Sequence, residues 1–393
     1  MKDIRWKLAA LAAAVIVAAC GGGETADAPS SKAGFSSVKV MGDSLSDSGT
    51  FLGIPGYGRI FSVQQSASEP NTIWTERLAV NVGTPSLCNY FKFTGTTFVP
   101  NPTAGCTSYG VGGGRVNNPA SNGGAAAPFS IVYQLQAGGA IAGTYKATDL
   151  LLMDGGANDA ADLVGAYLGA TTPAGQLAYA QFLATLLTPL PPLTNATDLA
   201  KAGGQYMVAV ANQFADAITT NALNRGATHI AILNAPDITG TPRFQTVLDS
   251  IAAASGGGTA GATARAQAQG LFQSWVVAFN TQLSARFAGD GRVAVVDFYT
   301  EFQNQLANPA QYGLTNVKTP ACPITGVGTD GLPTYTFETC TAAALSANPP
   351  AGVTGGSSWW TNYAFSDSFH PTPYGYQLMS QLVSRSLAQV GWL

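Results

Sequence analysis

The chain has 393 residues, of which 46% are hydrophobic and only 10% are charged, and its formal net charge is −3 at pH 7. This length and apolar content allow one large domain or two smaller ones, and they exclude a chain that is disordered throughout. The charge balance and the absence of a basic patch in the sequence argue against nucleic-acid binding.

The N-terminus has the pattern of a targeting segment. Basic residues precede a short apolar run, Leu8–Ala19, which is too short to span a bilayer. The run ends at Cys20 in a pattern that resembles the bacterial lipobox, in which the cysteine is acylated and becomes the first residue of the mature chain. The alternative is an ordinary secretory signal in which Cys20 is incidental.

These features predict a signal peptide over residues 1–19 and a flexible tether over residues 20–35, which is rich in glycine, alanine and serine. Residues 36–393 are expected to form the folded domain. Acylation of Cys20 would make the protein an outer-membrane lipoprotein at the cell surface or in the periplasm. An extracellular protein is the alternative.

Short apolar, β-branched runs predict four buried parallel strands, at Val38–Met41, Leu150–Met153, His229–Leu233 and Val293–Phe298. Helical patterns follow at residues 174–187, 206–224, 262–287 and 374–390, and residues 255–261 have the composition of a linker between helices. This alternation predicts an α/β fold with a parallel sheet covered on both faces.

Two long segments interrupt the alternation, residues 53–130 and residues 300–365, and each contains one pair of cysteines. We expect ordered, functional surface insertions. Four cysteines allow three pairings, of which the sequence-local one is Cys88–Cys106 and Cys322–Cys340. Metal binding is the alternative, but neither pair has close ligand spacing and the chain has two histidines, so no metal or cofactor is expected.

A serine follows the first predicted strand, in Gly42-Asp43-Ser44-Leu45. A strand-to-helix turn exposes such a side chain at the carboxyl edge of the sheet, where open α/β folds bind ligands. The backbone N–H of Ser44 would also lie at a helix N-terminus, where it can donate to an oxyanion. The alternative is a helix N-cap without catalytic function.

Near the C-terminus, Asp367 lies three residues before His370, in a segment that precedes the last predicted helix. A serine hydroxyl needs an imidazole to take its proton, and the imidazole needs a carboxylate to orient it. The spacing predicts that Ser44 is the nucleophile, His370 the general base and Asp367 the orienting acid. The other histidine, His229, lies within an apolar strand, where a structural role is expected.

Two further motifs are candidates for binding an oxyanion. Glycines at Gly110–Gly114 allow backbone N–H groups to approach a substrate, and Asn158 follows the second predicted strand. A flexible loop and a helix cap are the alternatives. The glycine run has no preceding strand and lacks the third glycine of the dinucleotide fingerprint, which argues against a nucleotide site.

Together these motifs resemble the four blocks of the GDSL or SGNH hydrolase family, in the family's order, from about Ser37 to Leu393. Gly42–Leu45 resembles the first block, the glycine turn the second, Gly156–Asp159 the third and Asp367–His370 the last. The resemblance implies a flavodoxin-like three-layer α/β/α sandwich, the SGNH hydrolase fold, here with long disulfide-bearing insertions.

The resemblance also implies a triad of Ser44, His370 and Asp367, with oxyanion donors in the backbone N–H groups of Ser44 and Gly113 and the side chain of Asn158. Gly112 or Gly114 is the alternative to Gly113. The second block usually opens with asparagine, where this chain has Ser108. Asp237, in a segment that also resembles secreted members, is the competing acid.

The expected activity is that of a carboxylic ester hydrolase, an esterase or lipase that works through an acyl-enzyme. An acyltransferase or a (lyso)phospholipase would use the same residues, and the ester is a small molecule, a lipid or a polyester. A metal-dependent phosphodiesterase is disfavoured by the two histidines. A non-catalytic, surface-binding lipoprotein is the remaining alternative. We expect a monomer, attached to the membrane by its lipid.

Aromatic residues lie shortly before Asp367, among them Trp359 and Trp360. If they are partly exposed, the two indoles would form the wall of an apolar substrate pocket. The alternative is that they form a buried core beneath the loop.

Overall fold

The computed structural model describes residues 34–65 and 71–393. Cys20 and the predicted signal peptide lie outside the described residues, so their assignments stay predictions. Within the described ranges, no helix is both long and apolar enough to cross a membrane.

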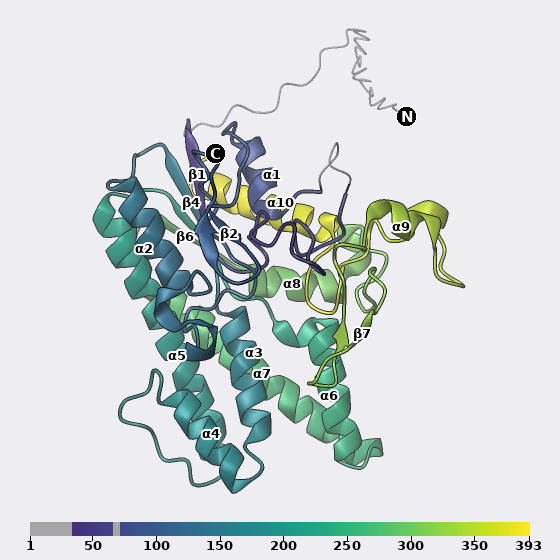
Figure 1. Cartoon of the computed structure of the whole chain (residues 1–393). Coiled ribbons are helices and arrows are strands. Elements are labelled where there is room, and N and C mark those ends of the chain that lie inside the picture. Colours follow the sequence, from purple (N-terminus) through teal and green to yellow (C-terminus); the bar gives the residue numbers. More distant parts are fainter. Residues whose placement is uncertain (1–33, 66–70) are drawn as a thin grey trace, which may run out of the picture. The chain divides into compact units, whose positions relative to one another are not determined.

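Four parallel strands form the central sheet, in the order β1–β4–β5–β6. Figure 1 labels three of them, β1, β4 and β6. Their bounds are Ser37–Met41 for β1, Asp149–Asp154 for β4, Ile230–Leu233 for β5 and Val293–Val296 for β6. The prediction of four parallel strands is therefore confirmed. The predicted fourth strand is too long, because the side chain of Asp297 accepts a hydrogen bond from the Thr300 N–H and begins a helix there.

The segment around Ser108 extends the sheet by one parallel bridge, in which Ser108 is opposite Val40 of β1. The Val40 N–H donates to the Thr107 carbonyl at 3.0 Å, and the Tyr109 N–H donates to the Val40 carbonyl at 2.7 Å. This pairing carries the glycine turn to the carboxyl end of β1, beside the turn that contains Ser44.

The helices of the domain have the following bounds: α1 Trp74–Asn81, α2 Ile131–Ala142, α3 Ala157–Gly169, α4 Pro173–Leu183, α5 Ala196–Asn221, α6 Pro242–Ala254, α7 Gly258–Arg286, α8 Phe298–Ala307, α9 Ala342–Ala347 and α10 Pro373–Gln389. The four predicted helices correspond to α4, α5, α7 and α10. Helices α1 and α9 lie within the predicted insertions, α8 lies at the start of the second one, and α2, α3 and α6 were not predicted from the sequence.

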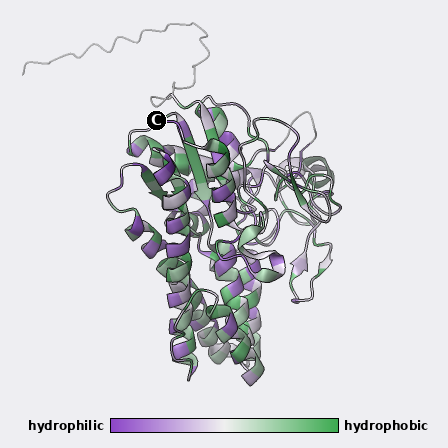
Figure 2. Cartoon of the chain, turned by 60° about the vertical axis from the view of Figure 1, so that its left-hand side comes forward, coloured by the Kyte–Doolittle hydropathy of each residue, from purple (hydrophilic) through white to green (hydrophobic). Residues whose placement is uncertain are grey.

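Helices cover both faces of the sheet. Alternate strand residues point to opposite faces, so Met41 and Leu151 pack with α2, α3, α5 and α7, whereas Val40 and Leu152 pack with α1, α8 and α10. Figure 1 shows α2 and α5 on one side of the strands and α1 and α10 on the other. In Figure 2 the strands of the central sheet are mostly hydrophobic, and the helices alternate between hydrophobic and hydrophilic residues. The three-layer α/β/α prediction is confirmed.

Two helices begin earlier than their patterns predict. Helix α5 begins at Ala196 instead of residue 206, because Asn195 caps it and its glycines fit against α7, where a Cβ at Gly203 would lie only 2.7 Å from the Trp275 ring. Helix α7 begins at Gly258, within the predicted linker. In both helices, packing outweighs the low helix propensity of glycine.

Both insertions contain short ordered elements. The first holds α1 and the hairpin of β2 (Phe91–Phe93) and β3 (Phe98–Pro100), and the second holds β7 (Gly326–Val327), β8 (Pro333–Thr334) and α9. Disulfides join Cys88 to Cys106 and Cys322 to Cys340, as the sequence-local pairing predicts.

Candidate active site

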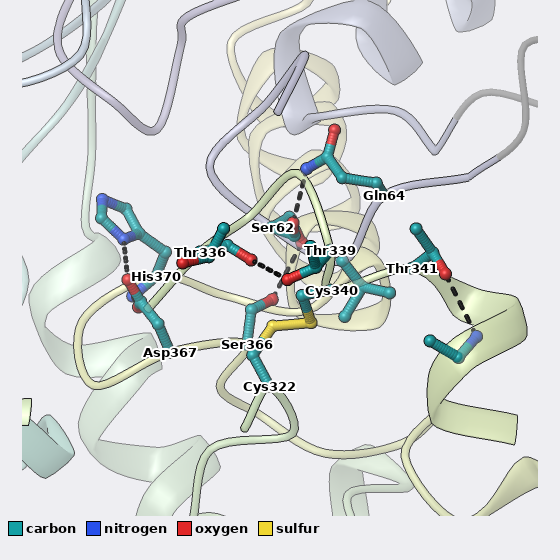
Figure 3. Close-up of a disulfide and its surroundings, with 12 residues drawn as sticks. Ser62, Gln64, Cys322, Thr336, Thr339, Cys340, Thr341, Ser366, Asp367 and His370 are labelled. Atoms are coloured by element: carbon teal, nitrogen blue, oxygen red, sulfur yellow. Dashed lines mark hydrogen bonds and ion pairs between the residues drawn. A yellow bond between two sulfur atoms is a disulfide. The ribbon is translucent and has the colours of Figure 1, made fainter. Parts of the chain in front are cut away.

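Ser44, His370 and Asp367 meet at the carboxyl edge of the sheet, although 326 positions separate the serine from the histidine. Ser44 lies in the turn after β1, and the other two residues lie in the turn before α10. His370 Nε2 is 2.8 Å from Ser44 Oγ, and His370 Nδ1 is 2.8 Å from Asp367 Oδ2. Figure 3 shows the Asp367–His370 pair. This arrangement allows proton transfer between the hydroxyl and the imidazole.

The turn itself holds the Asp367 carboxylate in place. Asp367 Oδ1 accepts hydrogen bonds from the backbone N–H groups of Phe369 at 2.8 Å and His370 at 2.6 Å. Burial raises the pKa of Asp367, but the imidazole and these donors outweigh burial, so the pKa lies below its ordinary value. Asp367 is therefore a carboxylate that accepts the Nδ1–H of His370, which leaves Nε2 free to accept the serine proton.

Aromatic rings from both insertions lie against the imidazole. The centroid of the Phe61 ring is 5.2 Å from that of His370, and the centroid of the Phe337 ring is 5.8 Å from it. Neither residue was predicted from the sequence to lie at the site, because a single phenylalanine in a long insertion carries no local signal of its position. The two rings shield His370 from water.

Hydrogen bonds connect the insertions to the catalytic turn. The Ser62 and Ser366 hydroxyl oxygens are 2.9 Å apart, and Ser62 also donates to the Pro371 carbonyl at 2.8 Å. The Cys322 N–H donates to the Ser366 carbonyl at 2.7 Å. Figure 3 shows the Cys322–Cys340 disulfide beside this turn. The first insertion, the second insertion and the turn thus hold one another in position.

The backbone N–H groups of three consecutive glycines differ in their hydrogen bonding. The Gly112 N–H donates to Asp47 Oδ2 at 2.8 Å, and the Gly114 N–H donates to the Val111 carbonyl at 2.9 Å. The Gly113 N–H has no hydrogen-bond partner among the described residues. Gly113 has a φ of +75°, in the left-handed region that favours glycine. Because Asp47 accepts the Gly112 N–H, it helps to hold the glycine turn, a role that was not predicted from the sequence.

Asn158 lies in the first turn of α3 and connects the third motif to the glycine turn. Its side-chain amide donates to the Gly114 carbonyl at 2.9 Å and makes a longer contact of 3.3 Å with Asp43 Oδ2. The neighbouring Asp159 accepts hydrogen bonds from the backbone N–H groups of Val116 and Asn117, and burial raises the pKa of this carboxyl to about 6. These bonds hold the start of α3 against the segment that follows the glycine turn.

Ser108, where the family pattern has asparagine, is held mainly by its backbone. Its N–H donates to the Cys88 carbonyl at 3.1 Å, its carbonyl accepts from the Tyr90 N–H at 2.6 Å, and its hydroxyl accepts from Ser48 at 3.0 Å. The bridge to β1 and the nearby Cys88–Cys106 disulfide complete this anchor.

The competing acid does not reach the triad. Asp237, the competing acid, begins a 3₁₀ turn at Ile238–Gly240 and accepts hydrogen bonds from Thr239, Gln273 and Gln303 instead of His370. His229 packs against Phe35 and Trp392 beside the start of β5, as expected of a structural residue.

The two tryptophans lie in a small apolar cluster of the second insertion, together with the Cys322–Cys340 disulfide. Trp359 is 5% exposed and donates to the Leu345 carbonyl, and Trp360 is 7% exposed and donates to the Ser346 hydroxyl. Neither lines the pocket beside Ser44. Their placement corresponds to the buried core beneath the loop, because each indole finds its apolar contacts and its acceptor within the insertion.

Within residues 34–65 and 71–393, no three His, Cys, Asp or Glu side chains are grouped in a way that could hold a metal ion. No residues of the site are therefore assigned to a metal.

The comparison with known proteins agrees with this geometry. A family model described as GDSL-like Lipase/Acylhydrolase matches residues 38–383, a range that begins within β1 and contains Ser44 and His370. Among curated proteins, none matches the chain. Because the family model covers most of the sequence, the chain belongs to the GDSL-like lipase/acylhydrolase family, whose members are esterase- and lipase-type hydrolases.

Proposed function

We propose that the protein is a carboxylic ester hydrolase in which Ser44 is the nucleophile, His370 the general base and Asp367 the orienting carboxylate. The observation that carries this proposal is the continuous set of contacts from Asp367 through His370 to Ser44, with both distances at 2.8 Å. A structural role alone does not require a serine hydroxyl bonded to an imidazole that a buried carboxylate orients.

In the proposed first half-reaction, Ser44 Oγ attacks the carbonyl carbon of the ester while its proton moves to His370 Nε2. The tetrahedral intermediate collapses, the bond to the alcohol oxygen breaks, and His370 returns the proton to the departing alcohol. In the second half, His370 takes a proton from water as the water oxygen attacks the acyl carbon, and it returns this proton to Ser44 Oγ as the bond to Ser44 breaks and the acid leaves. Attack by an alcohol instead of water would transfer the acyl group.

The proposed oxyanion donors are the backbone N–H groups of Ser44 and Gly113 and the side-chain amide of Asn158. Gly113 is favoured over its neighbours because the N–H groups of Gly112 and Gly114 already donate within the protein. Asn158 has one amide hydrogen held by the Gly114 carbonyl, and its second contact, to Asp43, is long at 3.3 Å. That second hydrogen is available to a developing oxyanion.

We also propose that the protein is exported and attached to the membrane through an acylated Cys20, and that it acts as a monomer. Two disulfides support export, since such bonds persist mainly in oxidising compartments. The tether would hold the enzyme away from the lipid, within reach of ester substrates outside the cytoplasm.

Two measurements test the proposed activity. A fluorophosphonate probe should label the wild-type protein at Ser44, located by peptide mass spectrometry, and should not label Ser44→Ala. The wild type should hydrolyse p-nitrophenyl esters, and Ser44→Ala should not. Failure of the probe to label Ser44, together with no hydrolysis of any ester, would leave a non-catalytic binding protein.

A further inference from the structure

Arg115 directly follows the glycine turn, and its guanidinium contacts two segments of the proposed site at once. Its Nη1 donates to the Gly113 carbonyl at 2.6 Å. Its Nε and Nη2 donate to the two carboxylate oxygens of Asp162, at 2.5 Å and 3.0 Å. A bidentate pair of this kind fixes the plane of a guanidinium as well as its position, so the Nη1 donor is held toward Gly113.

Asp162 belongs to the helix that carries Asn158. It lies four residues after Asn158 in α3, and residues at this spacing are neighbours on one side of a helix. The side chains of Arg115, Asn158 and Asp162 line one hollow of the surface, which agrees with this arrangement. The guanidinium therefore joins the turn that contains Gly113 to the side of α3 that contains Asn158.

The backbone of Arg115 is itself anchored, so its side chain extends from a fixed point. Its N–H donates to the Phe129 carbonyl at 2.9 Å, and its carbonyl accepts from the Ile131 N–H at 2.9 Å. These bonds form a parallel bridge with Ser130, whose side chain caps the start of α2. The position of the guanidinium is thus set by the start of α2 as well as by the glycine turn.

The glycine turn needs contacts of this kind, because consecutive glycines allow many backbone conformations and the turn cannot fix its own geometry. Asn158 donates to the Gly114 carbonyl at 2.9 Å, and Arg115 donates to the Gly113 carbonyl. The residue whose N–H is the proposed oxyanion donor is therefore held by Arg115 through its carbonyl. The other proposed donor, Asn158, holds the next residue of the same turn.

The glycine turn packs directly against the turn that contains Ser44. A Cβ at Gly114 would lie 2.8 Å from the Gly42 carbonyl oxygen, and the Val111 N–H donates to that same carbonyl at 3.2 Å. A shift of the glycine turn would therefore change the position of its N–H groups relative to Ser44. A misplacement of about 1 Å at an active site can lower the rate by about 10²-fold.

We propose that Arg115 is a positioning residue of the oxyanion hole, which together with Asp162 holds the Gly113 N–H and the Asn158 amide in a fixed relative position. Arg115 acts through these two donors, and the donors contact the oxyanion. This inference rests on the proposed esterase function and on the donors proposed with it. It adds to that site an ion pair that aligns donors from two separate segments of the chain.

The test measures kcat and KM for p-nitrophenyl butyrate. Arg115→Met keeps the aliphatic part of the side chain and removes every donor, so it should lower kcat by about 10-fold to 10²-fold with KM within about twofold of the wild type. Arg115→Lys keeps the charge without the fork of donors and should recover only part of this loss. Asp162→Asn should lower kcat by a smaller factor, because it weakens the pair and leaves the bond to Gly113. These two variants carry the test if Arg115→Met does not fold.

A trifluoromethyl ketone gives a readout that a purely structural role would not change. Its adduct with Ser44 carries an oxyanion, so its inhibition constant depends on the oxyanion donors. In Arg115→Met this constant should rise by about the same factor as kcat/KM falls. The Tm should change little, since an ion pair whose side chains are 20% and 31% exposed contributes little to stability.

The matched control is Arg286→Met. Like Arg115, Arg286 donates to a carboxylate and to a backbone carbonyl, those of Asp216 at 2.6 Å and Asn212 at 3.4 Å. It lies at the end of α7 that leads into β6, whereas the triad lies at the opposite, carboxyl edge of the sheet. This variant should keep the wild-type kcat and the wild-type inhibition constant.

An unchanged kcat in Arg115→Met overturns the inference and leaves the esterase proposal intact. A higher KM with an unchanged kcat also overturns it, because Arg115 would then bind the substrate. Equal losses of kcat and Tm in Arg115→Met and Arg286→Met overturn it as well, because both would reflect a general loss of stability. If the wild type hydrolyses no ester and the fluorophosphonate probe does not label Ser44, the proposed function itself fails.

Discussion

The carboxyl group of Asp43 is buried in contact with that of Asp154, next to Ser44. Asp154 also accepts a hydrogen bond from the Ser46 hydroxyl, and its Oδ2 is 3.3 Å from the Asp43 N–H. A Cβ at Gly42 would lie 2.0 Å from Asp154 Oδ1, so the close approach requires glycine there. Asp154 at the end of β4 thus holds the turn that contains Ser44, a contact that was not predicted from the sequence.

The first prediction concerns this pair and pH. Burial, then the charge of Asp154 and the hydrogen bond to it, raise the pKa of Asp43 well above its ordinary value of 3.8. A carboxyl whose pKa is raised on folding stabilises the protein below its unfolded pKa, and this contribution is lost as the pH rises through the folded-state value. Asp43→Asn mimics the protonated form, so its Tm should decline less than that of the wild type as the pH rises from about 4 to about 9.

Calorimetry over this pH range measures the difference, with Asp216→Asn on the exposed part of α5 as a control that should follow the wild type. A constant offset in Tm between Asp43→Asn and the wild type at every pH would contradict the raised pKa.

The second prediction concerns the triad. Ser44→Ala and His370→Ala should each lower kcat by about 10⁴-fold or more, and the double variant should lose little further, because the residues act as one unit. Asp367→Asn should lose less, since the nucleophile and base remain. Asp237→Asn is the matched control and should retain most activity, because Asp237 contacts glutamines and Thr239 instead of His370. A greater loss in Asp237→Asn than in Asp367→Asn would reassign the acid.

The third prediction concerns Asn158. Asn158→Ala should lower kcat by about 10²-fold to 10³-fold with a small change in KM, because an oxyanion donor acts mainly in the transition state. The control is Asn118→Ala, which removes two side-chain bonds to carbonyls, those of Asn122 and Gly124, away from the triad. It should lower the Tm and leave kcat near the wild-type value. A change confined to KM in Asn158→Ala would make Asn158 a binding residue.

The fourth prediction concerns the disulfide beside the catalytic turn. Replacing Cys322 and Cys340 together by alanine should lower the free energy of unfolding by about 3 kcal/mol, as expected for a closed loop of this length. It should also lower kcat/KM, because the loop positions Phe337 against His370. Denaturant unfolding and ester kinetics measure the two effects. Unchanged kinetics in a destabilised variant would restrict the disulfide to stability.

The fifth prediction concerns membrane attachment. If Cys20 is acylated, the wild type partitions with membranes, and Cys20→Ala is either soluble or remains unprocessed. The intact mass of the mature chain decides the matter, because acylation adds the mass of the lipid to a chain that begins at Cys20. A mature chain with an unmodified cysteine, or one cleaved at another position, would indicate a plain secretory signal.

The amino-acid sequence by itself determined the features that depend on local pattern. Apolar β-branched runs predicted the four strands, because a strand buried on both faces is apolar at nearly every position. The Asp367-to-His370 spacing predicted their contact, since a carboxylate can accept the N–H groups two and three residues later within one turn. The order of the motifs identified the family, because each motif is a short continuous segment that can be recognised in the sequence alone.

Only the tertiary structure decided which groups meet across the chain. It distinguished Gly113 from its two neighbours through their hydrogen-bond partners, and it brought Phe61 and Phe337 from separate insertions to one imidazole. It also buried Trp359 within the apolar cluster of the second insertion. These outcomes depend on how side chains distant in sequence fill shared space, and packing of that kind leaves no periodic signal along the chain.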